Sequence, residues 1–417
     1  MQRIVHDVRS VELGEQTRFE GGHLCVARSE VTSLCSDPSL ATVRASWVSP
    51  GESARIVGPL DAVEPRAKGR GSAGGIFPGF VAPALPGGAG ATHVLRGSAV
   101  VVAGFLPRAQ EAVIEMSGEA AALSPLAATH NLVIEFEPAP DAPWEEVEAA
   151  LRRGALRLAA HLADAALDAE PDAIEELPGL AAPDPGGPPR AALVVNLQTQ
   201  GAFKDVFVYG RSMAGALPTL IEPGELEDGA VVSGQYGHPG LKNPTYLHQN
   251  NPVIAALRAR SDVALGALIL CPEPVDQATK ELVSAHAARL CRACGVDFAI
   301  VTKEGGGNAD SDMALKMDMI EDLGMPAVGL FAEMSGPDGS GAPLVAPPAR
   351  ATAMVSTGNY DERIALERVE RALGRERIAL ADADATAALE LPTAVIYAAL
   401  SPLGWGRLTC RELGQCA

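Results

Sequence analysis

Apolar runs alternate with helical segments from residue 192 onward, and this alternation constrains the fold more than any other feature of the chain. Five short apolar runs predict strands: ALVVNLQ from residue 192, VALGALIL from 263, DFAIVTK from 297, PAVGLFAE from 326 and ATAMVST from 351. Residues 274–291 and 311–324 have helical periodicity. Because fully apolar strands that alternate with helices indicate a parallel sheet covered on both faces, we predict a doubly wound α/β domain for residues 191–417.

The preceding part of the chain has a different pattern. Residues 1–110 contain short apolar runs separated by Gly and Pro, which predicts a β-rich domain, and a long Gly/Pro/Ala loop spans residues 69–93. A loop of that length is typically functional or mobile. Residues 111–190 are predicted to be a helical or α+β segment, with an amphipathic helix over 143–166 and a Pro/Gly-rich linker from 177 to 191.

Composition excludes several classes of protein. The formal net charge of −19 and the pI of about 4.9 make nucleic acids and anionic membranes poor partners. The first residues have no apolar core of a signal peptide, and no run of 18 apolar residues predicts a membrane span. Seven scattered cysteines do not form a disulfide framework. We therefore expect a cytoplasmic protein.

Reactive and ligand-binding side chains are dense in residues 228–254, DGAVVSGQYGHPGLKNPTYLHQNNPVI. The stretch holds Ser233, Tyr236, His238, Lys242, Asn243, Tyr246, His248, Asn250 and Asn251, together with glycines and prolines that bend the backbone. Such loops on a rigid scaffold commonly carry function. His238 and His248 could contribute to a metal site, but spacing positions no third ligand, so we predict no metal.

Three further loops leave the carboxyl ends of the predicted strands, where ligands of parallel sheets bind and where we expect the stretch 228–254 to meet them. They cover residues 198–204 (QTQGAFK), 304–312 (EGGGNADSD) and 357–361 (TGNYD). Amides, a hydroxyl and carboxylates in the first two predict substrate contacts, and the candidates are Gln198, Thr199, Gln200, Glu304, Asn308 and Asp310. The alternatives are that the first loop is a supporting turn and that Asp310 and Asp312 cap the following helix.

Two pairs of cysteines invite a redox interpretation. Cys291 and Cys294 form a C-x-x-C pattern at the C-terminal end of a predicted helix, whereas redox pairs normally lie at a helix N-terminus, so we interpret them as packing cysteines. Cys410 and Cys416 lie in the tail LTCRELGQCA, and the sequence leaves their role open.

Several long motifs resemble one known family. They are EAVIEMSGEAAALSPLAATHNLVIEFEP from residue 111, LQTQGAFKDVFVYG from 197, DGAVVSG from 228, KNPTYLHQNNPVI from 242 and KEGGGNADSD from 303. Together they resemble the precursor subunit of protein B in glycine, sarcosine and betaine reductases, with the D-proline reductase precursor as a relative. The resemblance extends from about residue 10 to residue 405.

The chain departs from this family at the residue that defines its chemistry. In the family, a loop cysteine after DGAxVSG cuts the chain and generates a pyruvoyl group that captures the substrate amine. Here the loop is QYGHPGL from residue 235, without a cysteine. Ser233 matches a serine that the family already has, so it is no relocated replacement. We predict an uncleaved chain without a pyruvoyl group or any other cofactor.

The resemblance implies a subunit that works with a thiol- or selenol-bearing partner subunit of protein B on a C–N or C–S bond of a small amino-acid-like substrate. Tyr236 and His238 occupy the loop of the family's reactive group and are candidate acid/base residues, with Lys242 and His248 as further catalytic candidates. Asn243, Tyr246, Asn250 and Asn251 would bind substrate. We expect an oligomer. The alternative is an inactive small-molecule-binding or scaffolding subunit of such a complex.

Overall fold

A mixed sheet forms the centre of the C-terminal part of the chain. The computed structural model describes all residues except 108, 200–205, 235–237 and 407–417. In spatial order the sheet contains β17 (Thr219–Leu220), β19 (Ala264–Glu273), β14 (Arg190–Gln198), β20 (Phe298–Thr302), β21 (Ala327–Glu333) and β22 (Ala353–Asn359). All neighbours pair in parallel except β17, which is antiparallel to β19. The predicted strands and their parallel pairing are confirmed.

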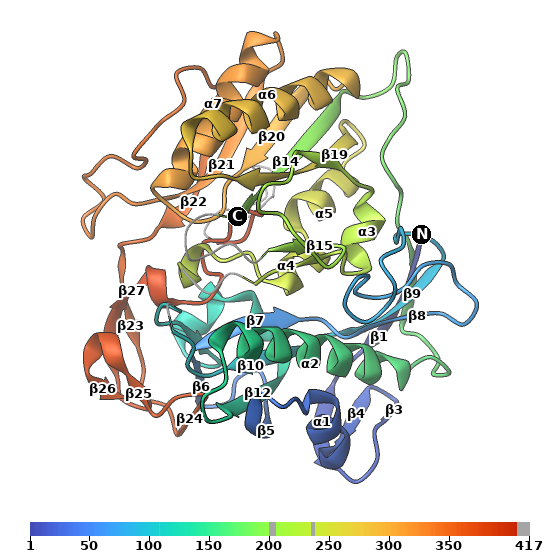
Figure 1. Ribbon diagram of the computed structural model, residues 1–417, viewed down its shortest axis with the longest axis vertical. Helices are drawn as coiled ribbons and strands as arrows, with labels where there is room; N and C mark the ends of the chain where they lie inside the picture. Colours follow the sequence, from blue (N-terminus) through green and yellow to red (C-terminus); the bar gives the residue numbers. More distant parts are fainter. Residues whose placement is uncertain (108, 200–205, 235–237, 407–417) are drawn as a thin grey trace.

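Helices cover both faces of this sheet (Figure 1). On one face, α6 (Gln277–Ala293) and α7 (Asn308–Asp322) bury their apolar sides against alternate residues of β14, β19 and β20. On the other face lie the short helices α3 (Pro223–Glu227), α4 (Thr245–Gln249) and α5 (Pro252–Arg258). The strands are apolar on both sides because each side packs against helices.

The order of the strands identifies where a ligand site is expected. From β14 the chain first adds β19 on one side and then β20, β21 and β22 on the other. This is one of the two common orders of doubly wound sheets, and the connections diverge between β14 and β20. The crevice at the carboxyl ends of these two strands is therefore the default binding position.

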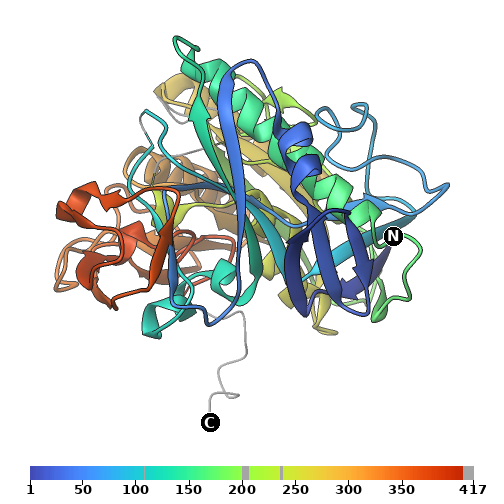
Figure 2. The same ribbon diagram turned by 90° about the horizontal axis from the view of Figure 1, so that it is seen from below.

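The N-terminal part is rich in strands. One sheet contains β5 (Leu40–Val48), β12 (His130–Pro138), β10 (Ser98–Ala103) and β7 (Pro59–Val63), and α2 (Trp144–Asp164) packs its apolar side on it. The helix α1 (Arg28–Cys35) lies beside α2 (Figure 2). A second sheet contains β13 (Ala173–Glu176), β1 (Gln2–Asp7), β9 (Ala91–Arg96) and β8 (Arg66–Lys68).

Smaller sheets complete the fold. They are β2 (Ser10–Gly14), β4 (His23–Ala27) and β3 (Arg18–Glu20); β16 (Arg211–Ser212), β15 (Phe207–Val208) and β18 (Val231–Val232); β23 (Arg363–Leu366) and β27 (Leu389–Pro392); and β25 (Arg377–Ile378) and β26 (Ala383–Asp384). The 3₁₀ turns are η1 (Glu119–Leu123), η2 (Pro125–Ala128), η3 (Pro239–Leu241), η4 (Ala379–Ala381) and η5 (Thr393–Val395).

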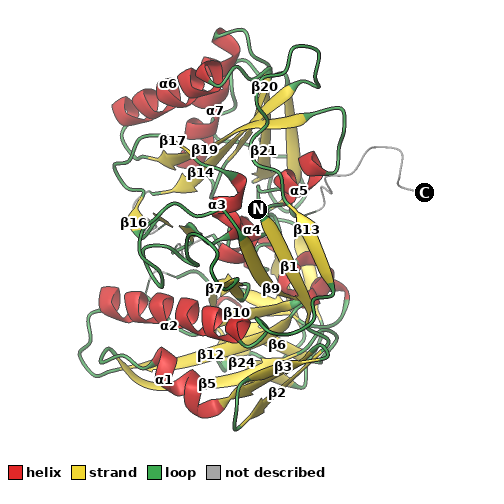
Figure 3. Cartoon of the chain, turned by 90° about the vertical axis from the view of Figure 1, so that its right-hand side faces the viewer, coloured by secondary structure: helices red, strands yellow, loops and turns green. Residues whose placement is uncertain are grey.

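Strand pairing connects segments that are far apart in the chain. The sheet β11 (Val113–Glu115), β6 (Ala54–Val57) and β24 (Arg371–Leu373) combines strands from all three predicted domain ranges. Figure 3 shows the six-stranded sheet and its helices stacked on the β-rich part. The last part of the described chain thus returns to the N-terminal strands, while the boundaries near residues 110 and 190 stay predictions.

The long glycine-rich loop of residues 69–93 packs onto the C-terminal part. Phe77 is fully buried, and its backbone N–H donates to the carbonyl of Asp228 at 2.8 Å. Gly79 has a φ of 88°, and a Cβ there would lie 2.2 Å from the carbonyl oxygen of Tyr209. Glycine is required at this position because the two backbones meet directly. Among the described residues, no helix is long and apolar enough to cross a membrane.

Candidate functional site

Glu304 joins the loop that follows β14 to the polar stretch 228–254. Its two carboxyl oxygens accept hydrogen bonds from the backbone N–H groups of Gln198 at 3.1 Å and Asn243 at 3.2 Å. The backbone N–H of Glu304 donates to Glu273 Oε1 at 3.0 Å, at the end of β19. Thr199 Oγ1 donates to the carbonyl of Glu273 at 2.9 Å. The predicted meeting of these loops at the carboxyl ends of the strands is confirmed.

A buried chain of hydrogen bonds lies beside this carboxyl group. Lys242 Nζ donates to Ser233 Oγ at 2.7 Å, and the backbone N–H of Ser233 donates to Thr245 Oγ1 at 2.9 Å. The Thr245 hydroxyl then donates to Asp61 Oδ2 at 2.6 Å, and its N–H donates to Asp61 Oδ1 at 3.0 Å. Asp61 comes from β7, so the N-terminal sheet contributes directly to the site.

Burial sets the protonation equilibria of this group. It lowers the pKa of Lys242, against the attraction of Asp61 and Glu304 for the charged ammonium. It raises the pKa of Asp61, and it raises the pKa of Glu304 to about 7, in both cases against the charge of Lys242. A carboxyl group that titrates near neutral pH is suited to give and take a proton. This arrangement can therefore perform acid/base chemistry.

A second ionic cluster lies where α7 begins. Lys303 forms an ion pair with Asp310, Lys280 forms one with Asp312, and Lys316 Nζ lies 3.7 Å from Asp312 Oδ1. Burial and the charge of Asp312 raise the pKa of Glu273 well above its usual range. The alternative that the two aspartates cap α7 is wrong, because Gly307 is the N-cap residue and it has no side-chain cap.

Buried lysines mark this region, and the sequence analysis named Lys242 among them but missed the other three. The chain has only six lysines among its 33 basic residues, and four of them, Lys242, Lys280, Lys303 and Lys316, are at most 2% exposed at this edge of the sheet. Lysine shifts its pKa on burial far more readily than arginine. A rare lysine in an arginine-rich chain was the available signal. The contributions of Asp61, Thr245 and Glu273 depend on tertiary contacts and left no such signal.

The other residues predicted in the 228–254 loop lie at different places. His238 adopts a left-handed conformation with φ 48°, and its ring centroid is 6.3 Å from that of Tyr360. Burial and the charge of Lys303 lower the pKa of His238, which places it at the same edge. Burial also raises the pKa of Tyr246. Tyr236 and Gln200 lie outside the described residues, as do Cys410 and Cys416.

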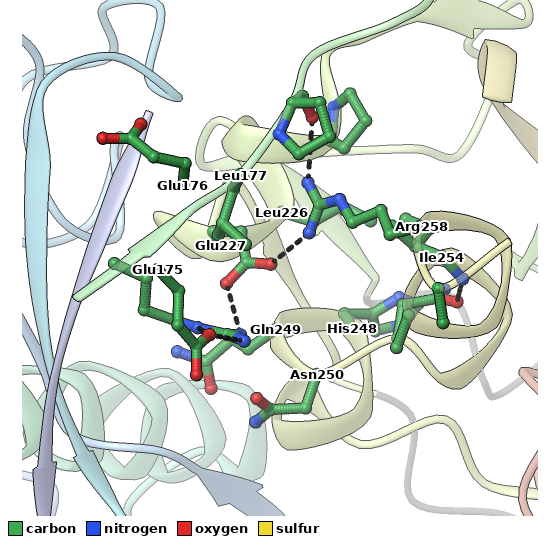
Figure 4. Close-up of a pocket in the computed structure, with 16 residues that line it drawn as sticks. Glu175, Glu176, Leu177, Leu226, Glu227, His248, Gln249, Asn250, Ile254 and Arg258 are labelled. Carbon is green, nitrogen blue, oxygen red and sulfur yellow. Dashed lines mark hydrogen bonds and ion pairs between the residues drawn. The ribbon is translucent and has the colours of Figure 1, made fainter. Parts of the chain in front are cut away.

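His248, Asn250 and Asn251 line a separate cavity, together with Gln249 (Figure 4). Asn250 exchanges hydrogen bonds with Glu64 and Arg66, and Asn251 Oδ1 accepts from the N–H of Ile254 to cap α5. Asn308, by contrast, begins α7, and its carbonyl accepts from Lys280 at 3.4 Å. The polar stretch therefore serves two neighbouring places, with Lys242 and Asn243 on the sheet edge and residues 248–251 on the cavity.

Cysteine chemistry has little support in the described part of the chain. Cys291 is buried in α6 and Cys294 is its C-cap residue, both as free thiols. Burial raises the pKa of Cys291, which disfavours a reactive thiolate. Within the described residues, no group of three or more His, Cys, Asp or Glu side chains is placed to hold a metal ion.

Comparison with known proteins identifies the class of protein to which this fold and this site belong. The chain belongs to the family of glycine/sarcosine/betaine reductase component B subunits, whose family model matches residues 1–410. No solved structure matches it.

Two relatives are similar to this chain over most of their length, and a third over a smaller part. The glycine reductase complex component B subunits alpha and beta of Acetoanaerobium sticklandii are 34% identical over 428 residues, covering 97% of each chain. The sarcosine reductase complex component B subunit alpha of Peptoclostridium acidaminophilum is 35% identical over 380 residues, covering 87% of each. The D-proline reductase proprotein of Acetoanaerobium sticklandii is 22% identical over 162 residues, covering 36% of this chain and 26% of the relative.

Proposed function

We propose that this chain is a protein B-type subunit of a glycine-reductase-like complex. It acts on a C–N or C–S bond of a small amino-acid-like substrate, together with a thiol- or selenol-bearing partner subunit. The family match over residues 1–410 supports the assignment to a reductase complex, as do relatives named as component B subunits that align over nearly their whole length. The partner's sulfur or selenium supplies the electrons, and this chain binds substrate and handles protons.

The placement of Glu304 beside Lys242 at the switch point of the sheet carries this proposal. Reductive cleavage of a C–N bond requires a proton for the departing nitrogen. Glu304 has a pKa of about 7 and lies between the loops of Gln198 and Asn243, so it can hold that proton at neutral pH. Gln198, Thr199 and Asn243 would hold the substrate, with Gln200 completing the loop in sequence.

We propose further that the chain stays intact and carries no pyruvoyl group. The family's group arises from a loop cysteine, and residues 228–254 contain none. The Ser233 hydroxyl, the nearest alternative, accepts a hydrogen bond from Lys242 and is 1% exposed. The residues present therefore do not fit the family's group, and Lys242, His238 and Glu304 must support the chemistry without it.

One observation favours an inactive binding or scaffolding subunit as the second candidate. Lys242 and His248 are each 1% exposed and Asn243 is fully buried, so these side chains hold the loop as tightly as core residues do. A subunit that has lost its chemistry would keep such a network for stability and for docking its partner.

Co-expression with the partner subunit of its own complex separates these candidates. The proposed enzyme gives a complex that reduces substrate in the presence of a dithiol, and neither subunit is active alone. Glu304→Gln lowers kcat of the complex by about 10²-fold or more, as loss of a general acid does. Glu281→Gln, on the exposed side of α6, leaves kcat unchanged. A stable complex without turnover supports the scaffolding candidate, and failure to form a complex refutes both.

A further inference from the structure

A pair of exposed aromatic rings lies where α2 begins. Phe105, two residues after β10, is 55% exposed, and Trp144, the first residue of α2, is 37% exposed. Their ring centroids are 5.9 Å apart and the ring planes make an angle of 80°, which is an edge-to-face contact. Every other Phe, Tyr and Trp among the described residues is buried or half-buried. The two exposed aromatic rings of the described chain therefore touch each other.

Contacts to a shared carboxylate extend this pair into a surface patch. The guanidinium carbon of Arg375 lies 5.7 Å from the ring centroid of Phe105. Arg375 donates to one carboxylate oxygen of Glu111 at 2.9 Å, and the backbone N–H of Leu380 donates to the other at 2.9 Å. The Leu380 side chain is 60% exposed. We call Phe105, Trp144 and Leu380 the aromatic patch.

The aromatic patch is separate from the hydrophobic cores. α2 buries Val147 and Leu151 against the N-terminal sheet, whereas none of the three residues of the patch belongs to a buried cluster. The fold thus leaves these side chains in water although burying them would be favourable. Exposed apolar patches mark interaction sites, and Trp and Phe are enriched at the centres of protein interfaces. The patch therefore has the character of a protein-binding surface.

Carboxylates beside the patch indicate what kind of protein fits it. Asp141, Glu145 and Glu146 flank Trp144 in the chain, and all three are exposed. They form no ion pair within the described residues. A second copy of this chain, which has a formal net charge of −19, would set these carboxylates against their own counterparts. A different protein, with Lys or Arg around an apolar socket, complements both the rings and the charges.

We propose that the aromatic patch is the docking surface for the partner subunit of the complex. The partner presents an apolar socket for Phe105 and Trp144, with Lys or Arg opposite Glu145 and Glu146. This assignment rests on the proposed function, which supplies the partner subunit as the occupant. A stable interface covers about 800 Å² of each protein, and a few central residues carry most of its binding energy. The aromatic patch forms that centre, and the carboxylates lie at the rim.

Binding of the purified full-length chain to the purified partner subunit, with Kd measured by biolayer interferometry, tests the docking surface. Trp144→Ala weakens binding by about tenfold or more, and Phe105→Ala weakens it in the same direction, because both remove central side chains. Leu282→Ala, at an exposed apolar position of α6, leaves Kd unchanged. Unfolding midpoints of these variants near that of the wild type show that the fold is intact.

Two double variants test the charges without shortening an apolar side chain. Glu145→Gln combined with Glu146→Gln lowers the association rate at low salt by about threefold or more, because rim charges steer the encounter. Glu15→Gln combined with Glu20→Gln removes the same net charge from exposed positions beside β3 and has a smaller effect. Equal effects of the two double variants overturn the proposed charge complementarity.

Each remaining outcome bears either on the docking surface alone or on the proposed function as well. Unchanged Kd in Trp144→Ala and Phe105→Ala, with binding by the wild type intact, overturns the docking surface and leaves the function standing. No binding by the wild type overturns both. A wild-type chain that is dimeric by itself in sedimentation equilibrium, and monomeric as Trp144→Ala, assigns the patch to a second copy and overturns the proposal.

Discussion

Lys242 Nζ lies 2.7 Å from Ser233 Oγ, with both side chains buried where the loop 228–254 meets the six-stranded sheet. Asp61 and Glu304 compensate the ammonium charge from two sides, although burial lowers its pKa. A β-rich N-terminal part and a doubly wound C-terminal part thus share one ionic centre. Substituting its residues one at a time tests how much each stabilises the fold.

Ser233→Ala removes the hydroxyl that accepts from Lys242, so the buried ammonium loses one hydrogen-bond acceptor. We expect the free energy of unfolding to fall by about 1–3 kcal/mol. Ser29→Ala, at an exposed position of α1, should change it by less than about 0.5 kcal/mol. Urea denaturation measures both, and equal values for the two variants would contradict the role of the Ser233 hydroxyl.

The raised pKa of Glu304 predicts that the free energy of unfolding depends on pH. This pKa is about 7 in the folded chain and about 4.5 in the unfolded chain, so between these values only the folded chain keeps the proton. The protonated carboxyl group of Glu304 therefore stabilises the folded chain by about 3 kcal/mol below pH 4.5, and this stabilisation is lost as pH rises through 7.

Denaturation of Glu304→Gln between pH 4.5 and 8 should show a shallower decline than the wild type, with the part due to Glu273 and Asp61 remaining because burial also raises their pKa, whereas Glu281→Gln should decline as the wild type does. An unchanged slope in Glu304→Gln would contradict the raised pKa of Glu304.

The lowered pKa of His248 predicts the opposite dependence of the free energy of unfolding on pH. This pKa is about 3 in the folded chain because of burial, so below pH 6.5 the unfolded chain takes up a proton that the folded chain does not. Stability is therefore lost as pH falls, by about 2 kcal/mol at pH 5.

His248→Leu removes this loss and two ring nitrogens that make no hydrogen bond within the described residues. At pH 7 we expect it to be neutral or stabilising, and at pH 5 to be more stable than the wild type. His286→Leu, at a half-buried position of α6, is the control. Strong destabilisation by His248→Leu at pH 7 would mean that the imidazole has a partner.

The described cysteines should differ in how fast their thiols react. Burial raises the pKa of Cys25, Cys35, Cys271 and Cys291, whereas Cys294 is half-buried at the end of α6. Brief treatment of the native protein with iodoacetamide at pH 8 should label Cys294 before these four. Peptide mass mapping reads out the order, and early labelling of Cys291 would contradict the packing interpretation.

Periodicity predicted the sheet well because strands buried on both faces are continuously apolar. The run from residue 192 became β14, and the helix predicted over 143–166 became α2. The meeting of the polar stretch with Glu304 was also predictable, since parallel strands all end at one edge.

Tertiary contacts between distant residues were not predictable. Lys280 and Asp312 pair only because α6 packs beside α7, and β24 pairs with β6 across more than 300 residues of chain. The five-residue helix α4 has too few residues for a periodic signal, yet it carries Thr245 to the ionic centre and His248 to the cavity. The sequence therefore predicted one site for residues that the structure divides between the edge of the sheet and a separate cavity.

Intact mass of the purified chain under reducing conditions, with and without a carbonyl-reactive hydrazide, tests the central claim most directly. We predict one unlabelled species near 43.0 kDa, because the loop has no cysteine from which a pyruvoyl group could form. Two fragments divided near residue 233, with the C-terminal one labelled by hydrazide, would contradict this account. They would mean that Ser233, beside Lys242, has taken over the role of the absent cysteine.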